Sequence, residues 1–363
     1  MENDQSTGWM SRIAEMKLAV GIPPAGTSVK DALDFIKGAE SLGVGTVWVP
    51  EAYGTDAATQ LGYLAAVTER IELGSGIMQI PARTPTMTAM TAATLDLLSG
   101  GRFVLGLGVS GPQVAEGWYG TPFTKPLLRT REYVEILRKI WDRKERLTFE
   151  GEAYSIPTRG GMGLGKPLKL MFQPPRRIPV YIAAMGPKNV ALTAEIADGW
   201  LPAFYSPDRA DVFKPYLEEG FKRGNRNPAD LDIVAPAFVS VARDFSVEAA
   251  RSVAKAMLSF YAGGMGAKEA NFYNDLLKRY GYSKEAEQIQ ELFLAGKRAE
   301  AAQAVPDELV DSMGLWGNDS RVAERLSKYS EAGVTTLQLN VVAGDTSARL
   351  SQIETVLRIG ESL

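Results

Sequence analysis

The chain has 363 residues, of which 45% are hydrophobic and 23% are charged, and its formal net charge is −3. This composition is typical of a globular protein that can bury a substantial core. The chain contains neither cysteine nor histidine, which excludes disulfides, thiolate nucleophiles, zinc held by cysteine or histidine, and every catalytic triad built on histidine.

The missing residue types also limit the chemistry that the protein can perform. Acid–base catalysis must use Asp, Glu, Lys, Tyr or water, and a metal could bind only through oxygen ligands. We therefore expect no metal site and favour a reaction whose chemistry a cofactor supplies.

Charge and hydropathy give expectations about location and partners. The slightly acidic charge predicts no nucleic-acid partner, and no stretch is long and apolar enough to predict a membrane span. Residues 1–15 begin with a polar, acidic stretch without the basic and apolar regions of a signal peptide. We predict a flexible leader over residues 1–15 and a cytoplasmic protein.

Apolar segments typical of strands alternate along the chain with segments of helical periodicity. The expected strands cover residues 18–22, 46–49, 71–77, 103–109, 180–183, 199–202, 233–242 and 335–341. The expected helices cover residues 31–42, 57–70, 86–98, 128–144, 188–197, 210–224, 247–261, 321–332 and 348–359. Two insertions interrupt the alternation: a hairpin at 147–156 with a Gly- and Pro-rich loop at 158–177, and a helical segment at about 262–316.

Repeated strand–helix units imply a parallel sheet, and eight of them fit a closed (β/α)8 TIM barrel better than an open sheet. We see no linker and predict one barrel domain over residues 16–363. The alternative is a doubly wound open sheet with a helical cap. In a barrel the active site forms at the carboxyl ends of the strands.

Residues 106–111 match the G-x-G-x-x-G pattern of a dinucleotide-binding loop. Such a loop normally follows the first strand of its domain, whereas this one follows the fourth, and we expect Pro112 to prevent a helix from continuing directly. We interpret Gly106 and Gly108 as small residues that make room on one face of a strand. Ser110 then lies at the carboxyl end of that strand, where a barrel carries its active site.

A different turn predicts an anion site. Gly186, Pro187 and Lys188 follow a predicted strand, and proline suits the first turn of the next helix. The free N–H groups and the dipole of that turn attract an anion, and Lys188 adds a full charge. The small residues Ala183 and Ala184 allow close backbone approach. An ordinary helix start with a surface lysine is the alternative.

Four stretches of the chain resemble the bacterial luciferase-like superfamily, and most closely its oxidoreductases that use the deazaflavin coenzyme F420. They are VWVPEAYGTDA at 47–57, LGSGIMQIPARTP at 73–85, RFVLGLGVSGPQVAEGWYG at 102–120 and IAAMGPKNVALTAEIADGW at 182–200. The fold of that family is a (β/α)8 barrel with insertions, which agrees with the independent count of units.

The resemblance implies which residues hold the cofactor. It implies a non-proline cis peptide bond at Gly76–Ile77 that presses against the deazaflavin ring, and it places Glu51 near that ring. It assigns Gly108, Val109 and Ser110 to the ring and the ribityl chain. The residues implied for the phosphodiester are Ala183, Ala184, Met185, Gly186, Pro187 and Lys188.

The resemblance also implies a reaction, namely hydride transfer between C5 of the deazaflavin and a small organic substrate. We favour reduction of an activated C=C, imine or nitro group, with Glu51 and Tyr119 as candidate catalytic proton donors. The alternative for Glu51 is a hydrogen bond that fixes the barrel mouth. The alternatives for the protein are an FMN-dependent luciferase-like monooxygenase and a non-catalytic protein that binds a flavin or deazaflavin.

Three further expectations concern substrate, cofactor tail and assembly. Tyr53, Trp118, Phe260 and Tyr261 are candidates for substrate contact. The aromatic stretch at 260–282 follows the seventh predicted strand and could line the substrate pocket or form a dimer interface, and we favour the pocket for Phe260 and Tyr261. The loop at 158–177 has five basic residues and no acid, and we hypothesise that it closes over the site and contacts the anionic oligoglutamate tail of F420. A solvated surface loop is the alternative.

The family that the chain resembles is often dimeric, and this resemblance implies a homodimer.

Overall fold

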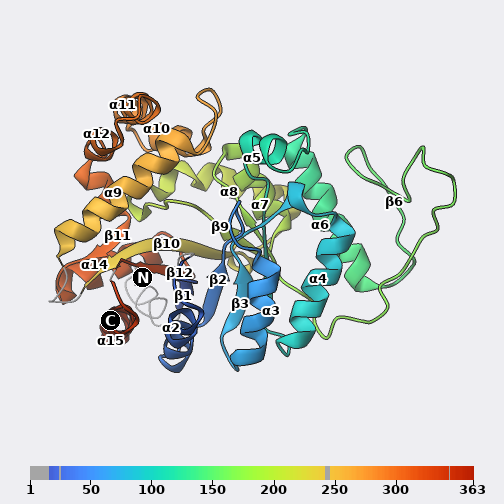
Figure 1. The fold of residues 1–363 in the computed structure, drawn as a ribbon, viewed down its shortest axis with the longest axis horizontal. Helices are drawn as coiled ribbons and strands as arrows, with labels where there is room; N and C mark the ends of the chain where they lie inside the picture. The colour runs from blue at the N-terminus through green and yellow to red at the C-terminus, as the bar shows by residue number, and fades with distance from the viewer. Residues whose placement is uncertain (1–15, 24–25, 242–245, 343) are drawn as a thin grey trace, which may run out of the picture.

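The computed structural model describes residues 16–363 except 24–25, 242–245 and 343, so the expected leader at 1–15 lies outside the described residues. Eight parallel strands close into a ring, because the last strand, β12, pairs with the first, β1 (Figure 1). In ring order they are β1 (Lys17–Gly21), β2 (Thr46–Val49), β3 (Glu72–Ser75), β5 (Phe103–Gly108), β8 (Val180–Ala183), β9 (Gly199–Leu201), β10 (Asp232–Ser240) and β12 (Thr336–Val341). The closed ring confirms the TIM barrel and excludes the open sheet.

Helices surround this ring, and each helix buries one of its faces against the strands (Figure 1). They are α2 (Val29–Ser41), α3 (Ala57–Val67), α4 (Pro85–Leu98), α6 (Pro126–Asp142), α7 (Pro187–Ile196), α8 (Lys214–Gly224), α9 (Val247–Gly264), α14 (Asp319–Glu331) and α15 (Thr346–Glu361), with short 3-10 turns at η1 (Ile80–Ala82), η2 (Pro207–Val212) and η3 (Pro228–Asp230). Ser28 caps α2 by accepting a hydrogen bond from the Asp31 N–H at 3.0 Å. Within the described part of the chain, no helix is long and apolar enough to cross a membrane.

The third strand and the glycine pattern show how the barrel mouth is shaped. The strand expected at 71–77 ends at Ser75 and resumes as β4 (Met78–Gln79), and the cis peptide bond between Gly76 and Ile77 lies between the two parts. A Cβ on Gly106 would lie 1.9 Å from the Ser75 carbonyl oxygen, and one on Gly108 would lie 2.7 Å from Ile77 Cδ1. Both glycines therefore make room on one face of β5, as predicted.

One expectation about this region is wrong. Helix α5 (Pro112–Gly117) begins directly at Pro112, although we expected the proline to prevent a helix there. Proline is tolerated in the first turn because the N–H that it lacks has no partner within the helix. The pattern at 106–111 is still not a dinucleotide loop, since it follows a barrel strand.

The insertions contain both predicted and unpredicted elements. The hairpin expected at 147–156 pairs β6 (Phe149–Glu150) with β7 (Ser155–Ile156), and its turn spans 151–154. The second insertion contains α10 (Phe272–Arg279), α11 (Ser283–Leu294), α12 (Arg298–Gln303) and α13 (Asp307–Ser312). It ends in a strand, β11 (Gly314–Trp316), which pairs with β10 and which is too short to show a period in the sequence.

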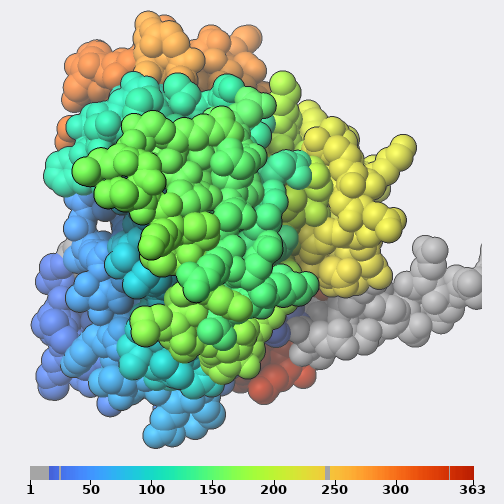
Figure 2. All heavy atoms as spheres, turned by 90° about the vertical axis from the view of Figure 1, so that its right-hand side faces the viewer, coloured from blue at the N-terminus to red at the C-terminus, as the bar shows by residue number. Residues whose placement is uncertain are grey.

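The basic loop at 158–177 lies along the flank of the barrel and not over its mouth. Figure 2 shows the green segment that follows α6 spread over this side of the molecule. Arg176 donates to the Phe103 carbonyl at 2.7 Å and pairs with Asp96, and Arg177 pairs with Asp198 at 2.7 Å. The Phe103 carbonyl and Asp198 lie at the amino ends of β5 and β9. Earlier in the loop, Arg159 pairs with Glu150 of the hairpin, and the Leu168 carbonyl accepts from the Leu147 N–H at 2.7 Å. These contacts disagree with the hypothesis that the loop closes over the carboxyl ends.

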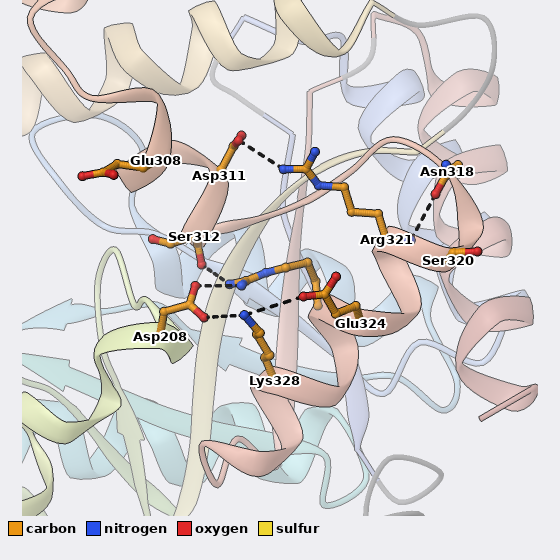
Figure 3. Close-up of a pocket in the computed structure, with 10 residues that line it drawn as sticks. Asp208, Glu308, Asp311, Ser312, Asn318, Ser320, Arg321, Glu324 and Lys328 are labelled. Carbon is orange, nitrogen blue, oxygen red and sulfur yellow. Dashed lines mark hydrogen bonds and ion pairs between the residues drawn. The ribbon is translucent and has the colours of Figure 1, made fainter.

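A network of ion pairs ties α14 to η2 and α13 around a polar cavity of about 610 Å³ (Figure 3). Arg325, which is 6% exposed, donates to Asp208 at 2.7 Å and to the Ser312 carbonyl, and Lys328 donates to Asp208 at 3.1 Å. Burial alone would raise the pKa of Asp208, but the hydrogen bonds from Arg325 and Lys328 outweigh it and hold that pKa below its usual range. The carboxylate therefore stabilises the fold in its charged form.

We predict that Asp208→Asn lowers the free energy of unfolding at pH 7 by about 1–2 kcal/mol, because it leaves the buried Arg325 without its carboxylate. A depressed pKa in the folded state means that this stabilisation is present above the ordinary aspartate pKa of about 3.9 and is lost as the pH falls below it. Urea unfolding at pH values from 7 to 3 would measure the difference.

Asp319→Asn is the matched control, since Asp319 pairs with Arg358 at 2.9 Å but both side chains are about 60% exposed. That substitution should change the stability by no more than about 0.5 kcal/mol. Equal effects of the two substitutions, or a pH-independent effect of Asp208→Asn, would contradict the account of the network.

Candidate active site

The barrel brings the four motifs to one face. Glu51 follows β2, Ile77 follows β3, Ser110 follows β5 and Met185 follows β8, and all these strands run parallel. Helices α5 and α10 lie at the same end of the molecule, at the upper edge of Figure 1. Since barrel enzymes carry their active sites at the carboxyl ends of the strands, this face is the candidate site.

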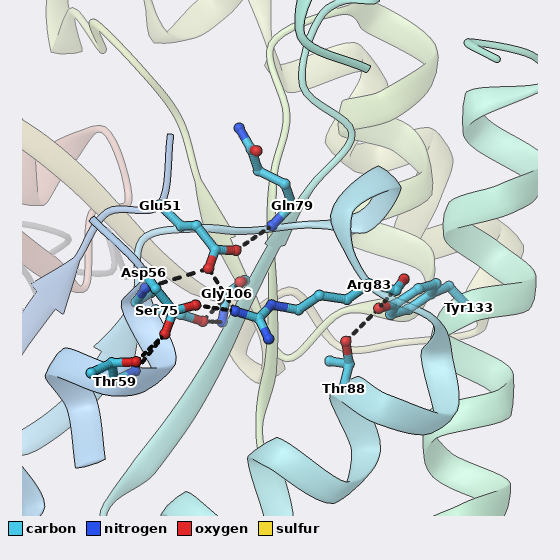
Figure 4. Close-up of polar contacts among 10 residues, drawn as sticks. Glu51, Asp56, Thr59, Ser75, Gln79, Arg83, Thr88, Gly106 and Tyr133 are labelled. Atoms are coloured by element: carbon cyan, nitrogen blue, oxygen red, sulfur yellow. Dashed lines mark hydrogen bonds and ion pairs between the residues drawn. The ribbon is translucent and has the colours of Figure 1, made fainter. Parts of the chain in front are cut away.

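Glu51 is buried and acts as a hydrogen-bond acceptor (Figure 4). Its carboxylate accepts from Arg83 Nη2 at 2.8 Å, from the Gln79 N–H at 3.3 Å and from the Ala57 N–H at 3.4 Å. Both oxygens are thus occupied by donors from three segments of the mouth. This geometry supports the alternative that Glu51 fixes the barrel mouth.

Arg83 joins two acids at this position. Besides Glu51 it donates to Asp56, which caps α3 by accepting from the Thr59 N–H at 2.7 Å. The hydrogen bond to Glu51 is the main cause that raises the pKa of Arg83, against the opposing effect of burial. The guanidinium is therefore a permanent positive charge that bridges two carboxylates.

Sequence analysis did not select Arg83 or Gln79, although both follow a predicted barrel strand within the motif at 73–85. Gln79 pairs with Gly108 across β4 and β5, and its buried side-chain oxygen Oε1 has no hydrogen-bond partner. A buried polar atom without a partner at a barrel mouth fits a bound cofactor or substrate. The position after the strand was the signal that could have found both residues.

Tyr119 follows α5 and is half-buried. Burial raises the pKa of its phenol, and the negative charge of Glu51 raises it further. The phenol therefore keeps its proton at neutral pH and lies close enough to Glu51 to be affected by its charge. Tyr119 is therefore a candidate proton donor at this mouth.

The end of β5 is shaped by an unusual backbone. Ser110 has a φ of 57°, in the left-handed region that residues other than glycine rarely adopt. Val109 is half-buried beside it, and Gly108 faces Ile77. The peptide bond Gly76–Ile77 is cis, as the resemblance implies.

The start of α7 is open to an anion. Pro187 begins this helix, Gly186 precedes it without a side-chain cap, and a Cβ on Gly186 would meet nothing within 4 Å. Lys188 is exposed. The buried oxygen Oδ1 of Asn189 has no hydrogen-bond partner. The residues fit a phosphate group, because an uncapped helix start with its dipole, an exposed cation and open space coincide.

The backbone before this helix is held by side chains. The Asn189 amide donates to the Ala183 carbonyl at 3.4 Å, and the Trp200 indole donates to the Ala184 carbonyl at 2.8 Å. Met185 is half-buried and packs against the core. The segment from Ala183 to Lys188 therefore has a fixed path beside the mouth.

The aromatic candidates lie on segments that follow barrel strands. The rings of Tyr53 and Trp118 are exposed and 6.4 Å apart, and the Tyr53 hydroxyl donates to the Met265 sulfur at 3.3 Å. Phe260 and Tyr261 lie in the last turns of α9, which ends at Gly264, with their rings 5.5 Å apart. Met265 thus joins the loop after β2 to the segment that follows α9.

Comparisons with known proteins agree with this geometry. Residues 13–336 match the family model described as luciferase-like monooxygenase. A Mycobacterium tuberculosis protein, named provisionally as a coenzyme F420-dependent oxidoreductase, is 47% identical over 309 residues, which are 84% of this chain and 88% of that protein. The 5,10-methylenetetrahydromethanopterin reductase of Archaeoglobus fulgidus is 33% identical over 316 residues, which are 85% of this chain and 88% of that protein.

A solved structure has the same fold over nearly the whole chain. It is the coenzyme F420-dependent tetrahydromethanopterin reductase from Methanopyrus kandleri, with a TM-score of 0.76 and 25% identity, covering 95% of this chain and 99% of that one. The family model and these relatives share the barrel whose mouth carries the site. This chain belongs to the luciferase-like monooxygenase family.

Proposed function

We propose that the protein is an F420-dependent oxidoreductase that transfers a hydride to or from a small organic molecule. The observation that carries the proposal is the meeting of the open start of α7, the Gly76–Ile77 bulge and the small residue Gly108 at one barrel mouth. Relatives at 47% and 33% identity bear the names of an F420-dependent oxidoreductase and a methylenetetrahydromethanopterin reductase, which supports the same chemistry.

The residues at the mouth suit the parts of this cofactor. The start of α7, from Gly186 to Lys188, would hold the phosphodiester, and Ala183, Ala184 and Met185 would line the backbone beside it. Gly76, Ile77, Gly108, Val109 and Ser110 would support the ring and its ribityl chain. When bound, F420 supplies or accepts a hydride at C5 of its deazaflavin ring.

The chain's own residues then supply position and a proton. Tyr119 donates the proton that accompanies hydride addition to an activated C=C, imine or nitro group, and solvent returns that proton to the phenolate. Glu51 is a positioning residue, because Arg83 and two backbone N–H groups occupy its carboxylate. We favour the direction of substrate reduction.

Two alternatives make different demands on the site. An FMN-dependent monooxygenase, which the name of the family model favours, would need only the single phosphate that the start of α7 accepts equally well. A non-catalytic protein would bind the cofactor without turnover. The half-buried phenol of Tyr119, just after the helix that follows β5, supports catalysis, since a storage protein needs no proton donor at the mouth.

We predict that Tyr119→Phe lowers the rate constant of F420H2-dependent reduction by about 10²-fold, because it removes the proton donor and leaves the ring in place. The dissociation constant of F420 should stay within about twofold of the wild-type value, since the phenyl ring still fills the same space. Stopped-flow oxidation of F420H2 with an activated alkene and fluorescence titration would measure the two quantities.

Glu51→Gln is the companion variant. Its amide still accepts from Arg83, so a positioning role predicts a smaller loss of rate than Tyr119→Phe causes. An unchanged rate in Tyr119→Phe together with a large loss in Glu51→Gln would reverse the two assignments.

We also propose that the chain forms a homodimer through the outer faces of α3 and α4. These helices pack on each other, and their only ionisable side chain apart from tyrosine is the buried Asp96. Their exposed large apolar residues are Tyr63, Met87, Met90, Leu97 and Leu98. An uncharged face that extends over two neighbouring helices is typical of an interface. A second copy of this chain presents the same uncharged face, so the two copies can pack these faces on each other.

We predict that Met90→Glu converts the dimer to a monomer, because it places a charge in the centre of an apolar contact. Sedimentation velocity would measure the mass, and circular dichroism would verify that the fold is kept. Met171→Glu is the control, since Met171 is at least as exposed but lies on the 158–177 loop. A monomeric wild-type protein, or an unchanged dimer in Met90→Glu, would contradict the proposal.

A further inference from the structure

We infer that the substrate of this site is an uncharged, planar organic molecule, a conjugated or aromatic compound that stacks on a cluster of five aromatic side chains at the barrel mouth. This inference rests on the proposed function and names its substrate class. The cluster, called here the mouth cluster, consists of Tyr53, Trp118, Phe204, Tyr261 and Tyr273.

Loops from four different strands contribute to the mouth cluster. Tyr53 follows β2, Trp118 follows β5 and α5, Phe204 follows β9, and Tyr261 and Tyr273 follow β10. Since the barrel gathers the carboxyl ends of all strands at one face, these rings surround the place where the reaction occurs. The cluster is therefore a property of the mouth and not of one helix.

The part of the cluster that follows β9 and β10 is closely packed. The ring of Tyr261 lies 4.8 Å from that of Tyr273 and 5.1 Å from that of Phe204, with interplanar angles of 69° in both pairs. Phe204 and Tyr273 lie 5.8 Å apart at 78°. These are edge-to-face contacts, the geometry that aromatic side chains favour, and the three half-buried rings form one aromatic wall.

A buried asparagine fixes this wall. Asn271 is 3% exposed, its amide donates to the carbonyls of Tyr261 and Ala262 at 3.0 Å, and its oxygen accepts from the Tyr273 and Asn274 N–H groups at 3.0 Å. The backbones of the two tyrosines are thus tied to one side chain. A wall that is ordered in advance loses little entropy when a rigid ring binds to it.

The other part of the cluster is open. Tyr53 and Trp118 are 52% and 65% exposed, and they are among the most exposed aromatic side chains of the described residues. Tyr53 stands two positions after Glu51, and Trp118 immediately precedes Tyr119. The two rings contact each other at 6.4 Å, and the Tyr53 hydroxyl donates to Met265 just beyond α9 at 3.3 Å. The open part therefore borders the closely packed part on the same face of the barrel.

The closely packed part of the mouth cluster, formed by Phe204, Tyr261 and Tyr273, consists of uncharged side chains. Burial and neighbouring tyrosines raise the pKa values of Tyr261 and Tyr273, and no acidic or basic side chain contributes. Arg83, the cation nearest Glu51, is paired with Glu51 and Asp56. The cluster thus offers apolar faces and neutral phenols, and an anionic substrate would lose its hydration without gaining a partner.

The test uses three ligands that differ in one property each. They are 4-phenylbut-3-en-2-one, which is flat and neutral, its para-carboxylate, which is flat and charged, and 4-cyclohexylbut-3-en-2-one, which is neutral and keeps the enone but has a ring that is not flat. Isothermal titration calorimetry of each ligand into the protein, with and without saturating F420, gives the dissociation constants. Separate titrations give the affinity of each variant for F420.

We expect the flat ketone to bind at least about tenfold tighter than either analogue, as a desolvated ring contact implies. Trp118→Ala should weaken that binding about tenfold, whereas Trp118→Phe should weaken it less, because a ring is retained. Met171→Ala, which removes a still more exposed apolar side chain from the 158–177 loop, should change nothing. The affinity for F420 should be the same in all three variants.

The inference would be overturned by equal affinities for the three ligands, by tighter binding of the carboxylate, or by an unchanged affinity in Trp118→Ala. Normal binding of F420 in the same protein would show that the proposed function is not what failed. If the wild-type protein does not bind F420, the proposed function fails instead. The titrations without cofactor then still decide whether the mouth cluster selects flat neutral rings.

Discussion

Closure of eight parallel strands into a ring is the constraint on which the rest of the structure depends. Because every strand runs in the same direction, every carboxyl end meets at one face, and residues that are far apart in the chain become neighbours there. The two glycines of β5 make this closure possible at the mouth. A side chain at Gly106 would collide with the Ser75 carbonyl, and one at Gly108 would collide with Ile77. The ring thus fixes where chemistry can occur before any site residue is considered.

The absence of histidine explains how the mouth is organised. Without an imidazole, the protein places a tyrosine beside an arginine–carboxylate group. Arg83 holds Glu51 and Asp56 together, so the carboxylates serve architecture. In the proposed reaction the cofactor would supply the redox step, and the protein would contribute position and the proton of Tyr119. This division of work agrees with a chain that has few catalytic residue types.

The repeating pattern of apolar segments predicts the barrel, because the spacing of apolar residues in each segment indicates whether it forms a strand or a helix. The strands β2 and β8 have the same bounds as predicted. Short elements are harder to predict. The strand β11 has three residues, and α5 begins at a proline that suggested a break. Pairing partners are not encoded locally at all. The basic side chains of the 158–177 loop suggested a cofactor contact, but Arg176 and Arg177 pair with Asp96 and Asp198, which are distant in sequence. Arg83 likewise pairs with Glu51 and Asp56, which are distant in sequence, so its bridging role cannot be predicted from its own motif.

The measurement that tests the central claim most directly is the affinity of the protein for F420 and for FMN, determined by equilibrium dialysis at low and high salt. We predict tighter binding of F420, weakened by salt and by Lys188→Ala, because the exposed lysine and the start of α7 attract an anionic group. Tighter binding of FMN would contradict the claim and move the protein to the oxygen-using members of its fold. Binding of neither cofactor would leave the barrel intact and refute the assignment of its mouth to a deazaflavin.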